Sequence, residues 1–183
     1  MSSGQEALGG AEIADLISSA IRDVRDYPQP GIVFKDITPL LADGAALAAV
    51  VAALAAGHGR IDKVAGIEAR GFILAAPVAV ALGAGFVPVR KQGKLPGPTI
   101  GNTYQLEYGI ATLEVHEDAF KAGDRVLIVD DVLATGGTAA ATADLVRRSG
   151  AEVIAITVLL ELGFLSGRAQ LPGLELRSLL VTT

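Results

Sequence analysis

Apolar residues recur along the chain at two periods, and these periods separate predicted helices from predicted strands. Near the N-terminus, apolar positions repeat every three or four residues, as on one face of an amphipathic helix. The positions of this stripe are Ile13, Leu16, Ile17, Ala20, Ile21 and Val24. Pro28 and Pro30 cannot continue a helix, so we expect it to end near Tyr27. Residues 1–10 are small and polar and predict a loose tail.

Strand-like and helix-like segments alternate after this helix. Residues 32–39 predict an irregular apolar loop. Asp43 is the expected N-cap of a helix that carries apolar residues as far as Leu54 and is closed by Gly57. The segments predicted next are a strand at 64–67, a loop at 68–71, a helix at 72–82 and a strand at 86–90.

One uncharged stretch, residues 71–89, approaches the length of a membrane span. Pro77 and Pro88 interrupt it, and Gly83 lies where a helix is expected to stop. We therefore interpret the stretch as a buried helix followed by a buried strand, with a membrane span as the alternative.

The second half of the chain continues the alternation beyond a segment rich in Gly, Pro and Lys. That segment, residues 91–102, predicts a mobile loop between alternating strands near 103–106 and 112–115, and we call residues 91–112 the flap. A buried strand at 126–129, a helix to Arg148 and an apolar strand at 153–160 follow. This order predicts an α/β fold, with a central, mostly parallel sheet flanked by helices and one domain spanning residues 1–183.

Composition and charge narrow the chemistry. The chain is 51% apolar and carries a net charge of -5, which disfavours a broad electrostatic grip on nucleic acid. It contains no cysteine, and its two histidines, His58 and His116, are too few for a zinc site and are expected at the surface. Only a hard ion such as Mg²⁺ fits the remaining ligands. Residues 1–10 lack the pattern of a secretory signal, so we expect a cytoplasmic protein that does not associate with membranes.

The most informative window, residues 126–138, is a buried strand that runs into two acids and a glycine turn. Ligands of parallel α/β sheets bind beyond the carboxyl ends of the strands. Gly136 and Gly137 let backbone N–H groups approach an anion, and Thr135 and Thr138 add hydroxyl donors near the positive end of a helix. A monophosphate is the expected ligand.

The two acids, Asp130 and Asp131, place four carboxylate oxygens beside that phosphate. Such oxygens are suited to accepting hydrogen bonds from the vicinal hydroxyls of a sugar. The alternative is that the acids cap the helix and the glycines only turn the chain. A Walker A loop is excluded because Gly-Lys-Ser/Thr is missing.

The sequence Val-Asp-Asp-Val-Leu-Ala-Thr-Gly-Gly-Thr at residues 129–138 resembles the phosphoribosylpyrophosphate-binding signature of the type I phosphoribosyltransferases. The resemblance implies that Asp130 and Asp131 bind the ribose hydroxyls, and that the turn from Ala134 to Thr138 holds the 5-phosphate. It also implies this family's fold, with a small N-terminal hood whose base-binding loop is residues 27–40 and a flexible β flap.

Further windows resemble the adenine-specific members of the family, at residues 27–40, 66–72, 90–97 and 106–109. In these members an aromatic ring, here Phe34, lies against the purine, and backbone groups of Val33 and Lys35 meet the base edge. A 6-oxopurine reverses the donor and acceptor of adenine, and sites of that design can discriminate by on the order of 10⁴. Phe34 has a core position as its alternative, and Lys35 stands where much of the family has arginine.

The resemblance also implies roles for charged residues. It assigns Arg70 to the pyrophosphate, with further contacts from Arg90, Lys91 and Lys94. It makes Glu107, beside Tyr108, the proton-transfer residue. The alternatives are a solvated loop charge for the arginine, surface lysines and a solvated glutamate.

The activity implied is the reaction of adenine with 5-phosphoribosyl-1-pyrophosphate to give AMP and pyrophosphate in purine salvage. Mg²⁺ is expected to be held mainly through substrate and water, and a homodimer is implied. Two alternatives remain: a phosphoribosyltransferase for another base such as xanthine or hypoxanthine, and a regulator that binds phosphoribosylpyrophosphate and nucleic acid. The acidic balance of the chain disfavours the regulator.

Overall fold

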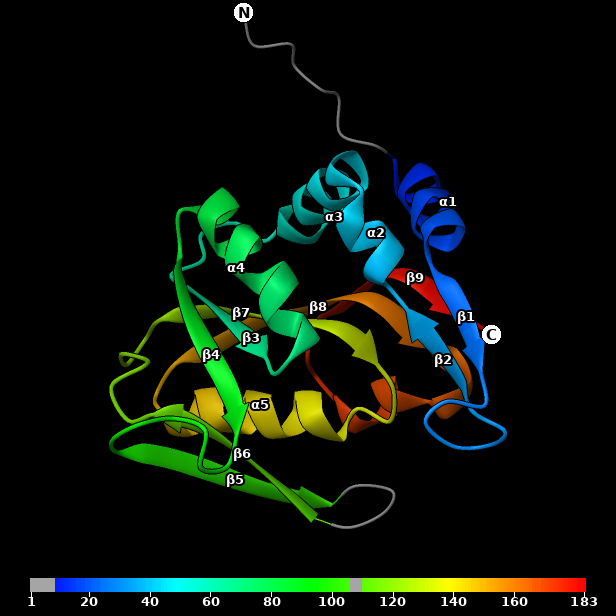
Figure 1. The fold of residues 1–183 in the computed structure, drawn as a ribbon. Helices are drawn as coiled ribbons and strands as arrows, with labels where there is room; N and C mark the ends of the chain where they lie inside the picture. The colour runs from blue at the N-terminus through cyan, green and yellow to red at the C-terminus, as the bar shows by residue number, and fades with distance from the viewer. Residues whose placement is uncertain (1–8, 106–109) are drawn as a thin grey trace, which may run out of the picture.

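A seven-stranded sheet forms the centre of the fold (Figure 1). The computed structural model describes residues 9–105 and 110–183. The strands of this sheet are β3 (Lys63–Ile67), β4 (Gly85–Lys91), β5 (Thr99–Gln105), β6 (Ile110–His116), β7 (Arg125–Leu133), β8 (Glu152–Leu162) and β9 (Leu176–Thr182). Their order across the sheet is β5-β6-β4-β3-β7-β8-β9. The pairs from β4 to β9 are parallel, whereas β6 is antiparallel to both of its neighbours.

Helices cover both faces of the sheet (Figure 1). They are α1 (Gly10–Ala20), α2 (Thr38–Ala42), α3 (Gly44–Ala55), α4 (Arg70–Leu82) and α5 (Gly137–Arg148). Alternate residues of β7 face opposite layers: Leu127 and Val129 join the apolar cluster beneath α1–α4, while Val126 and Ile128 join the cluster beneath α5. A strand buried on both faces needs a continuous apolar run, which is why these four residues are all branched.

A two-stranded antiparallel sheet lies apart from the central one, beside the ends of β8 and β9 (Figure 1). It consists of β1 (Arg22–Arg25) and β2 (Val33–Asp36), and we call these strands with their connection the hood. Two short 3-10 turns, η1 (Gly163–Leu165) and η2 (Gly167–Gln170), connect β8 to β9.

The predicted fold class is confirmed: the fold is α/β, with a central, mostly parallel sheet flanked by helices. The uncharged stretch forms α4 followed by β4, as predicted. None of the helices formed by residues 9–105 and 110–183 has the length and apolar character needed to traverse a bilayer. Asp43 caps α3, because its carboxylate accepts from the backbone N–H groups of Ala45 and Ala46 at 2.9 and 3.1 Å.

Two predictions for the N-terminal part are wrong. The first helix ends at Ala20, and Val24 lies in β1. Residues 32–39 are not an irregular loop, because they contain β2 and the first two residues of α2. The two hood strands form only by pairing with each other across a connection of several residues, for example Val24 with Phe34. Neither strand carries enough residues to show a period of its own.

Boundaries elsewhere also shift. Helix α4 begins at Arg70 rather than at Phe72, and β5 begins at Thr99 within the predicted flap loop. Strand β7 continues past the acid pair to Leu133, since the ladder with β8 extends to its pairing with Glu161. Strand β9 was not predicted at all.

His58 is buried rather than at the surface. Its Nε2 lies 3.0 Å from the carbonyl oxygen of Leu54 near the end of α3, and burial lowers its pKa. In the sequence, His58 stands between two glycines, which suggests an exposed loop. Its burial follows from packing at the end of α3, which the local sequence does not show.

Candidate active site

The turn between β7 and α5 brings the predicted phosphate-binding residues together. Gly136 precedes the helix at φ +86°, a conformation that favours glycine. Within the described part of the chain no side chain caps α5, so the N–H groups of its first turn are left for a ligand. A cavity of about 70 Å³ opens there, and its walls include Asp130, Ala134, Thr135, Gly136 and Thr138.

The two acids are held differently. Asp131 is buried, and its Oδ2 lies 2.7 Å from a guanidinium nitrogen of Arg70. The geometry of that approach gives charge compensation without an aligned hydrogen bond, so Oδ2 has no hydrogen-bond partner among the described residues. Asp130 accepts the backbone N–H of Asp131 at 2.9 Å.

The carboxyl of Asp130 is more enclosed than the residue as a whole. Its exposure is intermediate, yet Oδ1 would lie 2.7 Å from a Cβ placed on Gly71. Burial raises the pKa of the Asp130 carboxyl well above its usual range, and the neighbouring charge of Asp131 raises it further. The sequence prediction that both acids lie beside the phosphate turn is met by Asp130 in the cavity wall, whereas Asp131 turns toward Arg70.

Arg70 connects the acids to the hood. Besides its ion pair with Asp131, it donates a hydrogen bond of 3.3 Å to the carbonyl oxygen of Lys35. Its guanidinium carbon also lies 4.8 Å from the centre of the Phe34 ring, within the range of a cation–π contact. Phe34 in turn meets Tyr27 edge to face, with ring centres 5.2 Å apart. One side chain therefore joins the predicted base-binding and ribose-binding residues.

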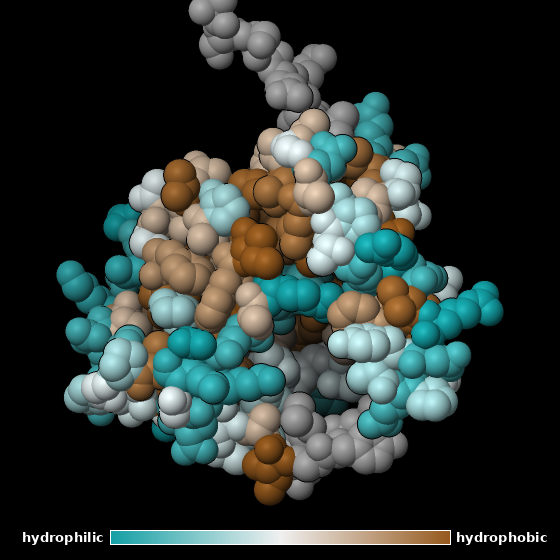
Figure 2. Space-filling view, in the orientation of Figure 1, coloured by the Kyte–Doolittle hydropathy of each residue, from teal (hydrophilic) through white to brown (hydrophobic). Residues whose placement is uncertain are grey.

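A larger cavity of about 340 Å³ lies behind the hood, lined by Ser18, Ile21, Asp23, Lys35, Leu160, Leu180 and Thr182. Phe34 is not among its walls, because successive residues of a strand point to opposite faces. Lys35 pairs with Asp23 at 2.7 Å on this side. The space-filling view shows the molecule hollowed between the hood and the carboxyl ends of the strands (Figure 2). Of these two cavities, only the smaller one opens at a helix N-terminus, where backbone N–H groups are suited to an anion.

The hairpin of β5 and β6 packs against α5. Asn102 donates to the carbonyl oxygen of Ala141 at 3.1 Å, and the hydroxyl of Tyr104 lies 3.1 Å from that of Thr138. Tyr104 was missed at the sequence level, and its only signal was its place in an alternating strand. Glu107 and Tyr108, the predicted proton-transfer residue and its neighbour, lie outside the described residues.

Glu68 holds the end of β4 from which the predicted pyrophosphate cations project. Its Oε2 accepts from the backbone N–H of Lys91 at 3.0 Å and from Arg90 Nε at 3.1 Å, and Arg90 also donates to the carbonyl oxygen of Lys94 at 2.8 Å. The side chains of Lys91 and Lys94 are exposed at the end of β4 and in the loop beyond it. Val33, the other predicted base contact, is 46% exposed.

Proteins that resemble this chain are adenine phosphoribosyltransferases and cover most of its length. The family model described as phosphoribosyl transferase domain matches residues 35–169. The adenine phosphoribosyltransferase of Acidothermus cellulolyticus is 62% identical over 172 residues, which cover 93% of this chain and 97% of that protein. A crystal structure of adenine phosphoribosyltransferase from Rhodothermus marinus, 51% identical, superposes with a TM-score of 0.90 and covers 94% of this chain and 99% of its own.

A more distant structure carries a ligand. The adenine phosphoribosyltransferase of Saccharomyces cerevisiae, complexed with an imino-altritol bisphosphate and adenine, is 36% identical with a TM-score of 0.85 and covers 92% of this chain and 99% of its own. The resemblance drawn from the sequence windows is thereby confirmed. This chain belongs to the phosphoribosyltransferase family, among the adenine phosphoribosyltransferases.

Proposed function

We propose that the protein transfers a phosphoribosyl group from 5-phosphoribosyl-1-pyrophosphate to N9 of adenine, releasing AMP and pyrophosphate, as a step of purine salvage. One observation carries this proposal: at the turn between β7 and α5, an uncapped helix N-terminus opens into a small cavity whose wall includes Asp130, and the buried carboxylate of Asp131 is the next residue along β7. A phosphate and vicinal hydroxyls are the two groups that such a turn recognises, and phosphoribosylpyrophosphate carries both.

The turn offers the 5-phosphate N–H groups from the first residues of α5 and the hydroxyls of Thr135 and Thr138. Each charge-assisted hydrogen bond is worth about 1.5–3 kcal/mol net, so several together hold a phosphate without a lysine in the turn. Binding is therefore local, and the net charge of -5 does not oppose it strongly.

The acids are proposed to bind the ribose. Oδ2 of Asp131 is a buried acceptor without an aligned donor among the described residues, and a sugar hydroxyl would satisfy it. The carboxyl of Asp130 is enclosed, and burial disfavours its ionised form by raising its pKa. Hydrogen bonds from sugar hydroxyls would stabilise that ionised form.

The opposite end of the sugar is proposed to lie at α4. Strands β3 and β7 are parallel neighbours, so the helices that follow them, α4 and α5, begin at the same edge of the sheet. Arg70 is the first residue of α4, which likewise has no side-chain cap within the described chain. This second helix N-terminus and Arg70 suit the pyrophosphate, with Lys91 and Lys94 as further cations from the edge of β4.

The base is proposed to lie against Phe34, with backbone groups of Val33 and Lys35 reading its edge. A carbonyl that accepts from the exocyclic amine, and an N–H that donates to N1, select adenine over a 6-oxopurine. The contact of Arg70 with both Phe34 and Asp131 supports placing the base next to the ribose. Glu107 is proposed as the proton-transfer residue on the strength of the sequence resemblance.

The reaction is a substitution at the anomeric carbon. A lone pair on N9 forms the new C–N bond while the bond to the pyrophosphate oxygen breaks, the configuration inverts from α to β, and the N9 proton leaves toward Glu107. Charge builds on the sugar ring as an oxocarbenium ion and on the departing oxygen. The residues of the site contribute mainly by holding the two reactants in line.

Mg²⁺ belongs to this proposal. Among the residues that the structure describes, no three His, Asp or Glu side chains gather as metal ligands. The ion is proposed to be held mainly by oxygens of the substrate and by water, since Mg²⁺ in such sites usually keeps several of its waters. Bound to the pyrophosphate, Mg²⁺ would neutralise its developing charge.

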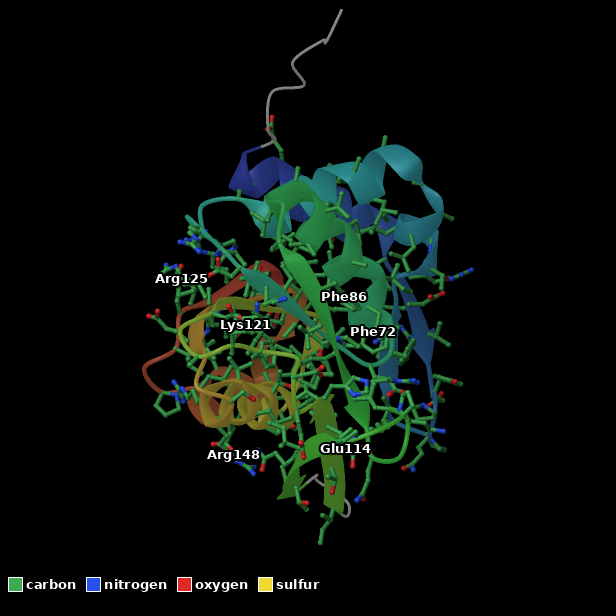
Figure 3. All side chains as sticks on the ribbon, turned by 90° about the vertical axis from the view of Figure 1, so that its left-hand side faces the viewer. Phe72, Phe86, Glu114, Lys121, Arg125 and Arg148 are labelled. Atoms are coloured by element: carbon green, nitrogen blue, oxygen red, sulfur yellow. The ribbon has the colours of Figure 1, made fainter. Side chains whose placement is uncertain are left out.

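We further propose that residues 1–183 act as one domain in the cytoplasm and that two copies associate. Large apolar side chains on α4 and β4 support the association: Ile73, Val80 and Phe86 are 46%, 81% and 38% exposed. Phe72 and Phe86 pack edge to face on this side of the molecule (Figure 3). Light scattering should give twice the chain mass, and Val80→Glu should give a monomer; a wild-type monomer would refute the association.

The test of the activity is direct. The protein is mixed with Mg²⁺, phosphoribosylpyrophosphate and one purine at a time, and nucleotides are separated by chromatography. We expect AMP from adenine and no product from hypoxanthine, guanine or xanthine. Asp131→Asn should abolish most of the AMP, whereas Asp144→Asn, on the exposed side of α5, should not. GMP, IMP or XMP as the main product would overturn the choice of base.

A further inference from the structure

The phosphate turn rests on a segment that lies about thirty residues further along the chain. The connection from β8 to β9 passes through η1 and η2, and η2 packs against α5. Gly167, the first residue of η2, lies with its backbone against the turn from Ala134 to Gly136. None of the residues proposed to bind the substrates lies in this connection.

The two backbone segments lie so close together that neither Gly136 nor Gly167 has room for a side chain. A Cβ on Gly167 would collide with the carbonyl oxygen of Ala134 and would lie 2.9 Å from the backbone nitrogen of Gly136. In the other direction, a Cβ on Gly136 would collide with the carbonyl oxygen of Gly167. Both surfaces are backbone and cannot swing aside as a flexible side chain would.

Two anchors hold this segment in place. The guanidinium of Arg168 donates to both carboxylate oxygens of Glu161, at 3.1 and 2.6 Å, and to the carbonyl oxygen of Leu176 at 3.1 Å. Ser178 adds a hydrogen bond of 2.5 Å to the same carboxylate. At the other end of η2, Leu171 is buried in the apolar cluster beneath α5.

Glu161 is well placed to transmit this support. It pairs in register with Leu133, the last residue of β7 before the phosphate turn. Its side chain is 8% exposed, and the hydrogen bonds from Arg168 hold its pKa below the usual range. Because the strand end that leads into the turn lies beside the residue that anchors η2, the two are fixed to each other.

We propose that Gly167, fixed by the Arg168–Glu161 pair, is a positioning residue that supports the phosphate turn from behind and sets the direction of its N–H groups. The inference rests on the proposed function, since it assigns the supported groups to the 5-phosphate. Gly167 does not touch the ligand; it acts through Ala134 and Gly136.

The chemistry explains why such support matters. The turn contributes no charged side chain, so its grip on a phosphate depends wholly on the direction of several N–H groups and hydroxyls. A loss of one charge-assisted hydrogen bond lowers affinity by about ten-fold or more. A displaced turn that misdirects a single N–H is therefore enough to measure.

The first test uses Gly167→Ala and ribose 5-phosphate, with calorimetry as the readout. Gly44→Ala is the matched control, because Gly44 has no atom within 4 Å of the added Cβ. We expect Gly167→Ala to weaken ribose 5-phosphate by about ten-fold or more, and Gly44→Ala to bind as the wild type does. Wild-type affinity in Gly167→Ala would overturn the proposal.

The second test stays informative if Gly167→Ala fails to fold. Arg168→Met keeps the apolar stem but removes the hydrogen bonds to Glu161 and to the carbonyl oxygen of Leu176, and Arg168→Lys restores one hydrogen bond to Glu161. In steady-state assays we expect Arg168→Met to raise KM for phosphoribosylpyrophosphate by about three- to ten-fold, with KM for adenine within two-fold and partial rescue in Arg168→Lys. If KM rose equally for phosphoribosylpyrophosphate and adenine, or for neither, the Arg168–Glu161 pair would have only a structural role. That result would overturn the proposal.

The outcomes also separate this inference from the activity itself. Wild-type protein that binds no ribose 5-phosphate would refute the phosphate site and the support together. Wild-type binding with unchanged variants would refute the support alone and leave the activity standing.

Discussion

Arg70 contacts the hood at the Lys35 carbonyl and the Phe34 ring and also contacts Asp131, so its removal is the most revealing perturbation. Arg70→Met keeps a long apolar stem and removes the guanidinium. The variant loses the ion pair with Asp131 at 2.7 Å, the hydrogen bond to Lys35 and the contact with the Phe34 ring at 4.8 Å. It also leaves the carboxylate of Asp131, 9% exposed, without its compensating charge.

The size of the effect follows from these contacts. The side chain of Arg70 is 34% exposed, so the ion pair is worth less than a fully buried one, for which loss of a partner costs about 3–5 kcal/mol. We expect a loss of about 2–3 kcal/mol in the free energy of unfolding, cation–π contact and hydrogen bond included. For a chain of this length that lowers Tm by roughly 5–10 °C.

The control is Arg60→Met, because Arg60 makes an ion pair of the same 2.7 Å length with Asp62 while its side chain is 80% exposed. Surface pairs contribute about 0–1 kcal/mol, so Tm should move by less than about 3 °C. Calorimetry measures both variants, and steady-state assays should show KM raised for adenine and for phosphoribosylpyrophosphate in Arg70→Met alone. If Arg70→Met matched Arg60→Met in Tm and in both KM values, Arg70 would have no special part in holding the site together.

Three further predictions concern the chemistry and the support of the site. Glu107→Gln should lower kcat by about 100-fold or more while the affinity for phosphoribosylpyrophosphate stays near the wild-type value, because general acid–base groups contribute about 10²–10⁴ in rate; unchanged turnover would reject the role. Tyr104→Phe removes the 3.1 Å contact with Thr138 and should lower the free energy of unfolding by about 1 kcal/mol and raise KM for phosphoribosylpyrophosphate, whereas Tyr27→Phe, at an exposed ring, should leave that KM unchanged. Asp130→Asn should be more stable than the wild type at pH 7 but bind phosphoribosylpyrophosphate poorly. The pKa of Asp130 is raised in the folded state, so the folded protein binds more protons than the unfolded chain, and the wild type should lose stability relative to Asp130→Asn as pH rises above about 4; parallel stability curves for the two proteins in urea titrations would contradict this.

Much of the fold follows from local patterns. The helix capped by Asp43, the buried run at 126–129 and the helix to Arg148 were predicted because each carries its signal within a dozen residues. The turn between the strand and the helix was predicted for the same reason: its acids, glycines and threonines are consecutive in the chain.

Features that depend on distant partners were not predicted. Strand β7 continues through the polar pair at 130–131 because β8 pairs with it, and no apolar run marks that extension. The hood strands form by pairing with each other, and β9 forms against β8. Arg70 contacts Phe34 and Asp131, and Gly167 packs against Gly136. Each of these contacts joins residues at least thirty positions apart in the sequence. These contacts are determined by tertiary packing, and the sequence around each residue does not indicate its distant partner.

The most direct test of the central claim is a crystal structure of the protein with Mg²⁺ and phosphoribosylpyrophosphate. We expect the 5-phosphate within hydrogen-bond distance of the N–H groups of Gly136, Gly137 and Thr138, with the ribose hydroxyls on Asp130 and Asp131. A sugar phosphate bound elsewhere in the molecule, with the turn between β7 and α5 left empty, would contradict it.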